Sequence, residues 1–153
     1  MVKKLISADQ ILQLTGVSGD IDENILNPNI KKAQELQLNR IFGDALYNKI
    51  IADYPTYTGV YLTIYNDYAL PILANWSIAY HVKKNFAEIN DFGNSRKKTD
   101  QSEPLTGLDN DVLWKNYVED ATAYELKFVK FTQNNVIEEL KVDLPVTSTK
   151  IFY

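Results

Sequence analysis

The sequence predicts an all-α protein, a small helical bundle built as one domain. Two observations carry this prediction: apolar residues recur at helical spacing along most of the chain, and helix-capping residues stand at several expected ends. The chain has 153 residues, which suits one hydrophobic core better than two. We therefore expect a helical domain over residues 1–135 and an extended C-terminal arm over residues 136–153.

A short helix is expected near the beginning of the chain. Ser7 and Gln10 have the spacing of a capping box, in which each side chain accepts a hydrogen bond from the backbone of the other residue. Gly16 stands where a C-terminal cap belongs. The acidic, glycine-containing segment over residues 17–27 then predicts a turn-rich connection.

Two further helices are expected before residue 53. Asn27 and Pro28 indicate the start of the first, because asparagine caps helices and proline is favoured at the first helical position. A break is expected near residues 38–39. The next helix is expected over about residues 40–52, and Gly43 within it is interpreted as a point of close helix packing.

A long helix is expected over residues 60–88, after a loop at residues 53–59. Pro71 has no backbone N–H to donate, so a kink is expected there. Beyond Pro71, apolar residues surround the helix on nearly all sides. That pattern is typical of a helix buried at the centre of a bundle.

The remainder of the chain divides into a polar segment, a last helix and the arm. Residues 90–107 carry glycine, proline and a basic run, which predicts a long loop or hairpin. Asp109 is expected to cap a helix that reaches about residue 134. After it, Leu140 and its neighbours alternate with polar residues, as in an extended strand.

Charge and composition argue against several classes of function. The net charge of −4 is unfavourable for a protein that holds nucleic acid by neutralising phosphates. Cysteine is absent, which removes disulfides and thiolate metal sites, and no segment reaches the roughly 20 apolar residues of a membrane span. No catalytic motif is found, and the single histidine, His81, is expected to be structural. We expect no enzyme activity, no cofactor and no metal site.

Aromatic residues are abundant, with ten tyrosines and six phenylalanines. Tyrosine suits a protein interface because it combines a large contact area with a polar tip. The same properties suit the margin of a core beside water. The sequence leaves these two interpretations open.

Two segments are candidate interaction sites. The run Arg96-Lys97-Lys98 is the densest basic cluster, and it is either a solvated loop tip or a contact with DNA or an acidic partner. The arm can fold back on its own domain or add a strand to a neighbouring protein. Its candidate binding residues are Val142, Leu144, Val146, Ile151, Phe152 and Tyr153.

Several short motifs occur in an order that resembles one known family. They are Thr15-x-Val17-Ser18-Gly19-Asp20-Ile21-Asp22, Ile41-Phe42-Gly43-x-Ala45-Leu46-Tyr47, Tyr65-x-x-Tyr68-x-x-Pro71-x-Leu73-Ala74-x-Trp76 and Ala121-x-x-Tyr124. Together they resemble the head-to-tail connector (adaptor) proteins of tailed bacteriophages, especially phages of gut Bacteroidetes, including the crAss-like group. The resemblance covers roughly residues 12–135.

The resemblance implies a structural virion protein that forms a closed ring of about twelve copies at the portal or neck. Such a ring joins the head to the tail and lines the DNA channel, and the resemblance implies that Arg96, Lys97 and Lys98 contact the DNA in the channel or the portal. Its partners would be copies of itself, the portal protein, other neck and tail proteins and, transiently, packaged DNA, with no membrane involved. It would be assembled in the host cytoplasm and reside in the virion. Two alternatives stay open: a tail-side or stopper component of the neck, and a monomeric helical adaptor that binds a partner through its arm.

Overall fold

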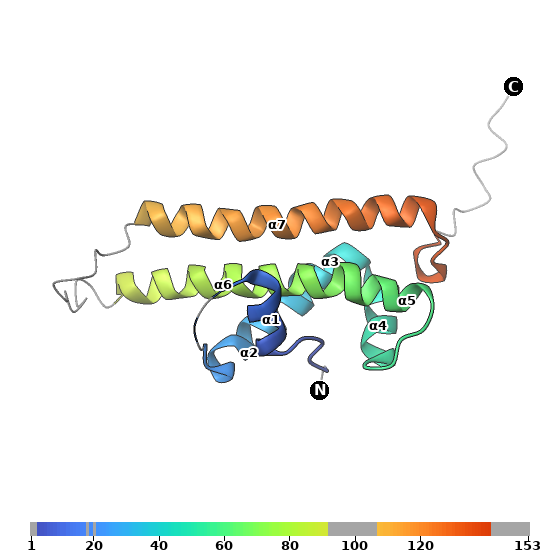
Figure 1. The fold of residues 1–153 in the computed structure, drawn as a ribbon, viewed down its shortest axis with the longest axis horizontal. Helices are drawn as coiled ribbons and strands as arrows, with labels where there is room; N and C mark the ends of the chain where they lie inside the picture. The colour runs from blue at the N-terminus through green and yellow to red at the C-terminus, as the bar shows by residue number, and fades with distance from the viewer. Residues whose placement is uncertain (1–2, 18, 20, 92–106, 142–153) are drawn as a thin grey trace, which may run out of the picture.

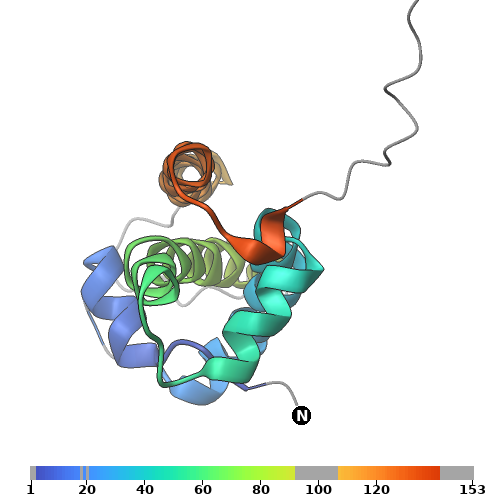
Figure 2. The ribbon, with the colours of Figure 1, turned by 90° about the vertical axis from the view of Figure 1, so that its right-hand side faces the viewer.

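The computed structural model describes residues 3–17, 19, 21–91 and 107–141, and within these residues the protein is all-α, as predicted. Two long helices, α6 (Leu70–Asp91) and α7 (Gly107–Asn134), lie side by side and run antiparallel (Figure 1). The helices from the first third of the chain cover the opposite side of α6. Seen end-on, α6 lies at the centre of the bundle (Figure 2). The predicted central helix is therefore confirmed.

Helix α1 (Ala8–Thr15) forms as its sequence predicts. The Ser7 hydroxyl accepts a hydrogen bond from the Gln10 backbone N–H at 3.2 Å, and the Gln10 side chain accepts one from the Ser7 N–H at 2.9 Å. Gly16 ends the helix in the left-handed conformation, with φ of 67°. The capping box and the glycine cap are both confirmed because they depend only on residues that are close in sequence.

The next helical run is continuous from Glu23 to Phe42, through α2 (Glu23–Lys32), the π-helix η1 (Ala33–Leu38) and α3 (Asn39–Phe42). Its predicted start at Asn27 and Pro28 is wrong. Asp22 caps the run instead, and its Oδ1 accepts the Asn24 N–H at 2.8 Å. The predicted break at residues 38–39 is also wrong, because the chain widens into a π-helix there rather than turning.

Gly43 ends this run, and α4 (Asp44–Asp53) starts directly after it, so the prediction of one helix over residues 40–52 is wrong at this point. Its φ of 77° and ψ of 159° lie in a region that is essentially restricted to glycine. A Cβ atom at Gly43 would meet no heavy atom within 4 Å, so close helix packing is not the reason for this glycine. The reason for the glycine is the backbone conformation that the chain adopts between α3 and α4.

Replacing Gly43 by alanine is therefore expected to lower the free energy of unfolding by about 1–3 kcal/mol. Thermal or urea unfolding followed by circular dichroism measures this change. Because Gly16 lies in the less restricted left-handed helical region, Gly16→Asn serves as a control and should cost less. Equal losses for the two variants would contradict this explanation of Gly43.

A second continuous run covers residues 60–91, through α5 (Val60–Thr63), the π-helix η2 (Ile64–Ala69) and α6. The helix departs from α-helical geometry shortly before Pro71, in η2, while the kink expected at Pro71 stays a prediction. A proline ring in a helix clashes with the carbonyl four residues earlier, and a π-helical turn moves that carbonyl away. Within α6, the Asn75 side chain also donates to the Pro71 carbonyl, four residues earlier, at 2.9 Å.

Helix α7 packs on α6 and α3 along one side, which we call the seam. Its residues recur at alternating spacings of three and four, as in a coiled coil: Trp114, Tyr117, Ala121, Tyr124, Phe128 and Phe131. The Phe128 ring lies 4.6 Å from that of Phe42 on α3, and the Phe131 ring lies 5.1 Å from that of Tyr68. Asp109 lies inside α7, so the prediction that it caps this helix is wrong.

The polar segment and the arm were both predicted with boundaries that the structure refines. Helix α6 continues to Asp91 and α7 begins at Gly107, so both ends of the predicted loop are helical and residues 92–106 lie outside the described residues. Leu140 belongs to a 3-10 turn, η3 (Glu138–Leu140), rather than to a strand. Ile137 is part of the hydrophobic core. The helical body therefore extends to residues 136–141.

Three tyrosines stack beside the first helical turns of the long run. The Tyr57 and Tyr65 ring centroids are 4.6 Å apart, and the Tyr54 ring lies 6.1 Å from that of Tyr65. The Tyr57 hydroxyl donates to the Ile50 carbonyl at 2.8 Å. Burial raises the pKa of Tyr65 to about 12 and raises the pKa of Tyr57 well above its usual range. The folded protein thus holds both hydroxyls in the protonated form.

These raised pKa values predict a loss of stability at alkaline pH. Above pH 10 the tyrosines of the unfolded chain ionise while Tyr65 stays protonated in the folded chain, so the unfolded state binds fewer protons. The stabilising contribution is complete below pH 10 and is lost as the pH rises towards 12. Urea unfolding between pH 8 and pH 11 should show a weaker pH dependence for Tyr65→Phe than for the wild type. Identical slopes would contradict this assignment.

Candidate interaction surfaces

The residues singled out from the sequence as interaction sites lie outside the described residues. They are Arg96, Lys97 and Lys98 of the basic cluster, and Val142, Leu144, Val146, Ile151, Phe152 and Tyr153 of the arm. Their roles stay predictions. The structure does describe the surfaces beside them, namely the base of the arm and the outer side of α7.

The base of the arm is fastened to the helical body. Ile137 is 3% exposed. The Tyr61 hydroxyl donates to the Glu139 carboxylate, at 2.8 and 2.9 Å from its two oxygens, and this bond raises the pKa of Tyr61 to about 12. The Lys49 ammonium lies 5.2 Å from the centre of the Tyr61 ring. The position from which residues 142–153 continue is therefore fixed next to α4 and α5.

Replacing Tyr61 by phenylalanine should loosen this base. The variant keeps the ring under Lys49 but removes the donor to Glu139, at a cost of about 0.5–1.5 kcal/mol. Hydrogen exchange of the backbone amides in residues 137–141 should become faster, while the amides of α1 keep their rates. Unchanged exchange in residues 137–141 would show that the bond does not hold the segment.

The tyrosines belong to the core and its margin. Apart from Tyr153, every tyrosine is either buried or packed partly buried against the core cluster. Among the described residues, the exposed large apolar side chains are all aliphatic: Leu14, Ile25, Leu36, Leu62, Val112, Leu113, Leu126, Val129 and Val136. Of the two interpretations that the sequence left open, the structure favours the core margin. The large apolar side chains that the described part of the chain leaves exposed are leucine, isoleucine and valine.

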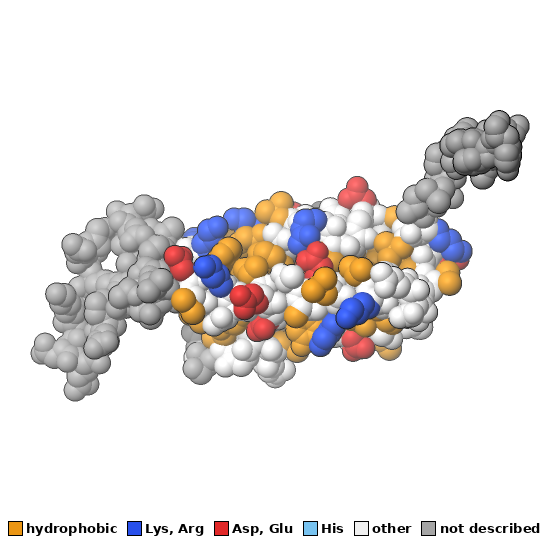
Figure 3. Space-filling view, turned by 90° about the horizontal axis from the view of Figure 1, so that it is seen from above, with side chains coloured by type: hydrophobic (Ala, Val, Ile, Leu, Met, Phe, Trp, Pro, Cys, Tyr) orange, Lys and Arg blue, Asp and Glu red, His pale blue; other side chains and the backbone are white. Residues whose placement is uncertain are grey.

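The outer side of α7 carries several of these aliphatic residues. Val112, Leu126 and Val129 lie away from the buried seam, and Leu126 is 59% exposed. Viewed from this side, apolar side chains lie among acidic and basic ones (Figure 3). Such a mixture is typical of the surface that one subunit offers to another, where apolar contacts are surrounded by polar groups.

One polar network ties α7 to the earlier helices beside these residues. The Arg40 guanidinium donates to both oxygens of the Glu125 carboxylate, at 2.9 and 3.2 Å. It also donates to the Gln37 side chain, whose amide donates to the Tyr80 hydroxyl at 2.8 Å. No sequence signal predicts this network, because its bonded pair Arg40 and Glu125 lie 85 residues apart.

Several acidic side chains have structural roles. Asp22 caps α2, and Glu23 forms an ion pair with Lys4. Glu138 pairs with Lys141, and Glu139 accepts from Tyr61. Within the part of the chain that the structure describes, no group of three or more histidine, aspartate or glutamate side chains is placed to hold a metal ion. In the same residues, no helix combines the length and apolarity needed to cross a membrane.

Comparison with known proteins identifies a family. The family model described as a family of unknown function, DUF6712, matches residues 38–138. This range begins at the end of η1 and includes α4, α6, α7 and the base of the arm. No curated protein and no solved structure matches the chain. Since the match covers more than half of the sequence, the chain belongs to the DUF6712 family.

Proposed function

We propose that this protein is a structural subunit that assembles with copies of itself into a closed ring at the portal or neck of a tailed bacteriophage. In this position the ring joins the head to the tail and lines the channel for DNA. The motif order that resembles phage connector proteins supports this proposal. Under this proposal the protein resides in the virion, with the portal protein and other neck proteins as its neighbours.

The observation that carries the proposal is the uncovered side of α7. This helix is held to the body by its seam, and its opposite side exposes Val112, Leu126 and Val129. A second copy that covers these side chains would remove apolar surface from water, at roughly 25 cal/mol per Å². A long, rigid helix offers such a surface without first having to become ordered.

A ring needs two different faces on each subunit, because the contact is repeated by rotation rather than by a two-fold axis. The bundle has such faces. Helix α7 forms one side, while α1 and α2 lie across α6 from it (Figure 2). On that second side, Leu14 and Ile25 are each 47% exposed. The two sides together supply apolar contacts for a head-to-tail arrangement of neighbouring copies.

Substitution on the outer side of α7 tests the proposal. The double variant Leu126→Glu/Val129→Glu should assemble at least tenfold more weakly than the wild type, because it buries two unpaired charges in the contact. Leu62→Glu, which changes an equally aliphatic and exposed residue on α5, is the control and should assemble normally. Size-exclusion chromatography with light scattering measures assembly, and circular dichroism checks the fold. Normal assembly of the double variant would contradict the role given to α7.

A further inference from the structure

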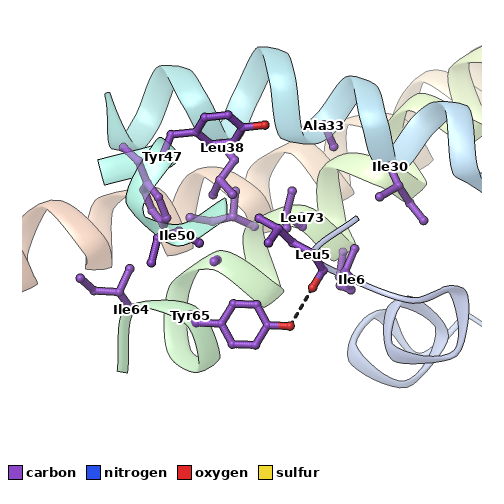
Figure 4. Packing of buried hydrophobic residues seen from close by; sticks show 14 of the residues in the cluster. Leu5, Ile6, Ile30, Ala33, Leu38, Tyr47, Ile50, Ile64, Tyr65 and Leu73 are labelled. Carbon is purple, nitrogen blue, oxygen red and sulfur yellow. Dashed lines mark hydrogen bonds between the residues drawn. The ribbon is translucent and has the colours of Figure 1, made fainter. Parts of the chain in front are cut away.

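The backbone of residues 3–6 forms hydrogen bonds with side chains of the helical body. The Leu5 N–H donates to the Gln34 side-chain oxygen at 2.7 Å, and the Gln34 amide donates to the Lys3 carbonyl at 3.0 Å. From the other side, the Tyr65 hydroxyl donates to the Leu5 carbonyl at 2.7 Å (Figure 4). The body therefore satisfies the backbone of this segment from both sides.

The two side chains that hold the backbone come from the two π-helices. Gln34 belongs to η1 and Tyr65 to η2. Gln34 is itself 2% exposed, so its amide is committed to the segment and not to water. Single π-helical turns are rare and are frequent at functional sites. Here both lie beside the same short peptide. We call the surface that contacts this peptide the groove, and its residues are Glu23, Asn27, Gln34, Ala52, Tyr54 and Tyr65.

The side chains of the segment are recognised as well. Leu5 and Ile6 are completely or almost completely buried, at 0% and 1% exposed. The Lys3 ammonium donates to the carbonyls of Ala52 and Tyr54 at the end of α4, where the helix dipole favours a cation.

The Lys4 side chain of the segment also has partners on the helical body. Its ammonium forms an ion pair with Glu23 and a hydrogen bond with the Asn27 side chain. All four residues, Lys3-Lys4-Leu5-Ile6, thus meet a matching group. The groove has the properties of a site for a peptide with two basic residues followed by two large aliphatic ones.

The exchange considered below depends on the connection that carries the segment. The segment continues into α1, and residues 16–22 join α1 to α2. Gly16 and Gly19 in this connection have φ of 67° and 109°. A seven-residue connection spans up to about 25 Å when extended. A change confined to these residues would therefore move α1 and the segment together to a neighbouring subunit.

We propose that the groove is a peptide-binding site which, in the assembled ring, is filled by residues 3–6 of the neighbouring copy. This inference rests on the proposed assembly. Exchange leaves every contact of the segment unchanged, so its free energy depends on the connection and on the local concentration of neighbours. A closed ring holds neighbouring subunits at a high local concentration. Exchange then links each subunit to the next one.

Cross-linking between two singly substituted chains tests the exchange. The chain contains no cysteine, so Lys4→Cys in one chain and Glu23→Cys in another introduce one thiol each. Both side chains are solvent-accessible, so the core stays intact. The two chains are co-expressed, the assembly is purified, and a short bis-maleimide reagent is added. Exchange is expected to raise the yield of a cross-linked dimer of one chain of each kind, because it seats position 4 of one copy beside position 23 of another.

A matched control uses the other long-range ion pair. Arg40→Cys and Glu125→Cys in separate chains replace the pair that joins α3 to α7, which the exchange leaves within one subunit. We expect at least tenfold more cross-linked dimer from the Lys4/Glu23 pair of chains than from this control. A native mass that shows a ring, together with cross-linking at the control level, would overturn the exchange and leave the proposed function standing. A monomeric native mass would overturn the proposed function and the exchange together.

Discussion

Replacing Phe128 by alanine is expected to lower the free energy of unfolding by about 3–5 kcal/mol. Phe128 is 2% exposed, and within residues 111–134 of α7, where burial is described, it and Ala121 are the two buried residues. Its ring contacts Phe42 on α3 and lies 5.7 Å from the ring of Tyr68 on η2. Its removal leaves a cavity at the point where three helices meet.

Urea unfolding followed by circular dichroism measures this loss. Leu126→Ala is the matched control, because Leu126 lies on the same helix but is 59% exposed, and it should change stability by less than about 0.5 kcal/mol. Should Phe128→Ala and Leu126→Ala prove equally mild, the seam would not be what holds α7 to the body.

The second large effect is expected at Leu5. This side chain is 0% exposed, and it lies with Ile6, Ile50 and Leu73 inside the cluster of buried residues (Figure 4). Leu5→Ala should lower the free energy of unfolding by about 2–5 kcal/mol, since it removes apolar contacts and leaves the groove partly empty. The measurement is again urea unfolding, and the affected region can be located by hydrogen exchange of the α1 amides.

Lys3→Ala provides the comparison for Leu5. The Lys3 ammonium is exposed and donates to carbonyls at 3.3 and 3.5 Å, so its removal should cost less than about 1 kcal/mol. A Leu5 variant as stable as the Lys3 variant would mean that residues 3–6 are dispensable for the fold. The account of the groove would then fail.

The fold class could be predicted because it depends on periodicity, which is a local property of the sequence. The central position of α6 followed from its apolar residues on all sides, and the caps of α1 followed from Ser7, Gln10 and Gly16. The start of α2 was predicted wrongly because two local signals competed. Asn27 and Pro28 resemble a helix start, but Asp22 caps the helix earlier and thereby brings Leu26, which is 0% exposed, into the core.

The site features could not be predicted because they join residues far apart in sequence. The Gln34 side chain binds the backbone of Leu5 and Lys3, which lie 29 and 31 positions earlier in the sequence. The Tyr65 hydroxyl binds the Leu5 carbonyl, 60 positions earlier. No spacing rule connects them. The tyrosines are a different case: composition alone left their role open, and only the packing around Tyr57 and Tyr65 showed that they serve the core.

The outer side of α7 and the groove have different consequences for assembly. In the proposed assembly, a neighbouring copy covers aliphatic side chains of α7 such as Leu126, and the exchanged residues 3–6 link one subunit to the next. Contacts of the first kind form and break with concentration, whereas an exchanged segment must leave its groove before the subunits separate. An assembly that combines both is expected to dissociate slowly on dilution.

Native mass spectrometry of the purified wild-type protein tests the central claim most directly. The account predicts a discrete high-order oligomer of about twelve copies that persists on dilution. A monomer at every concentration, also in the presence of portal particles to which it fails to bind, would contradict a self-assembling ring subunit.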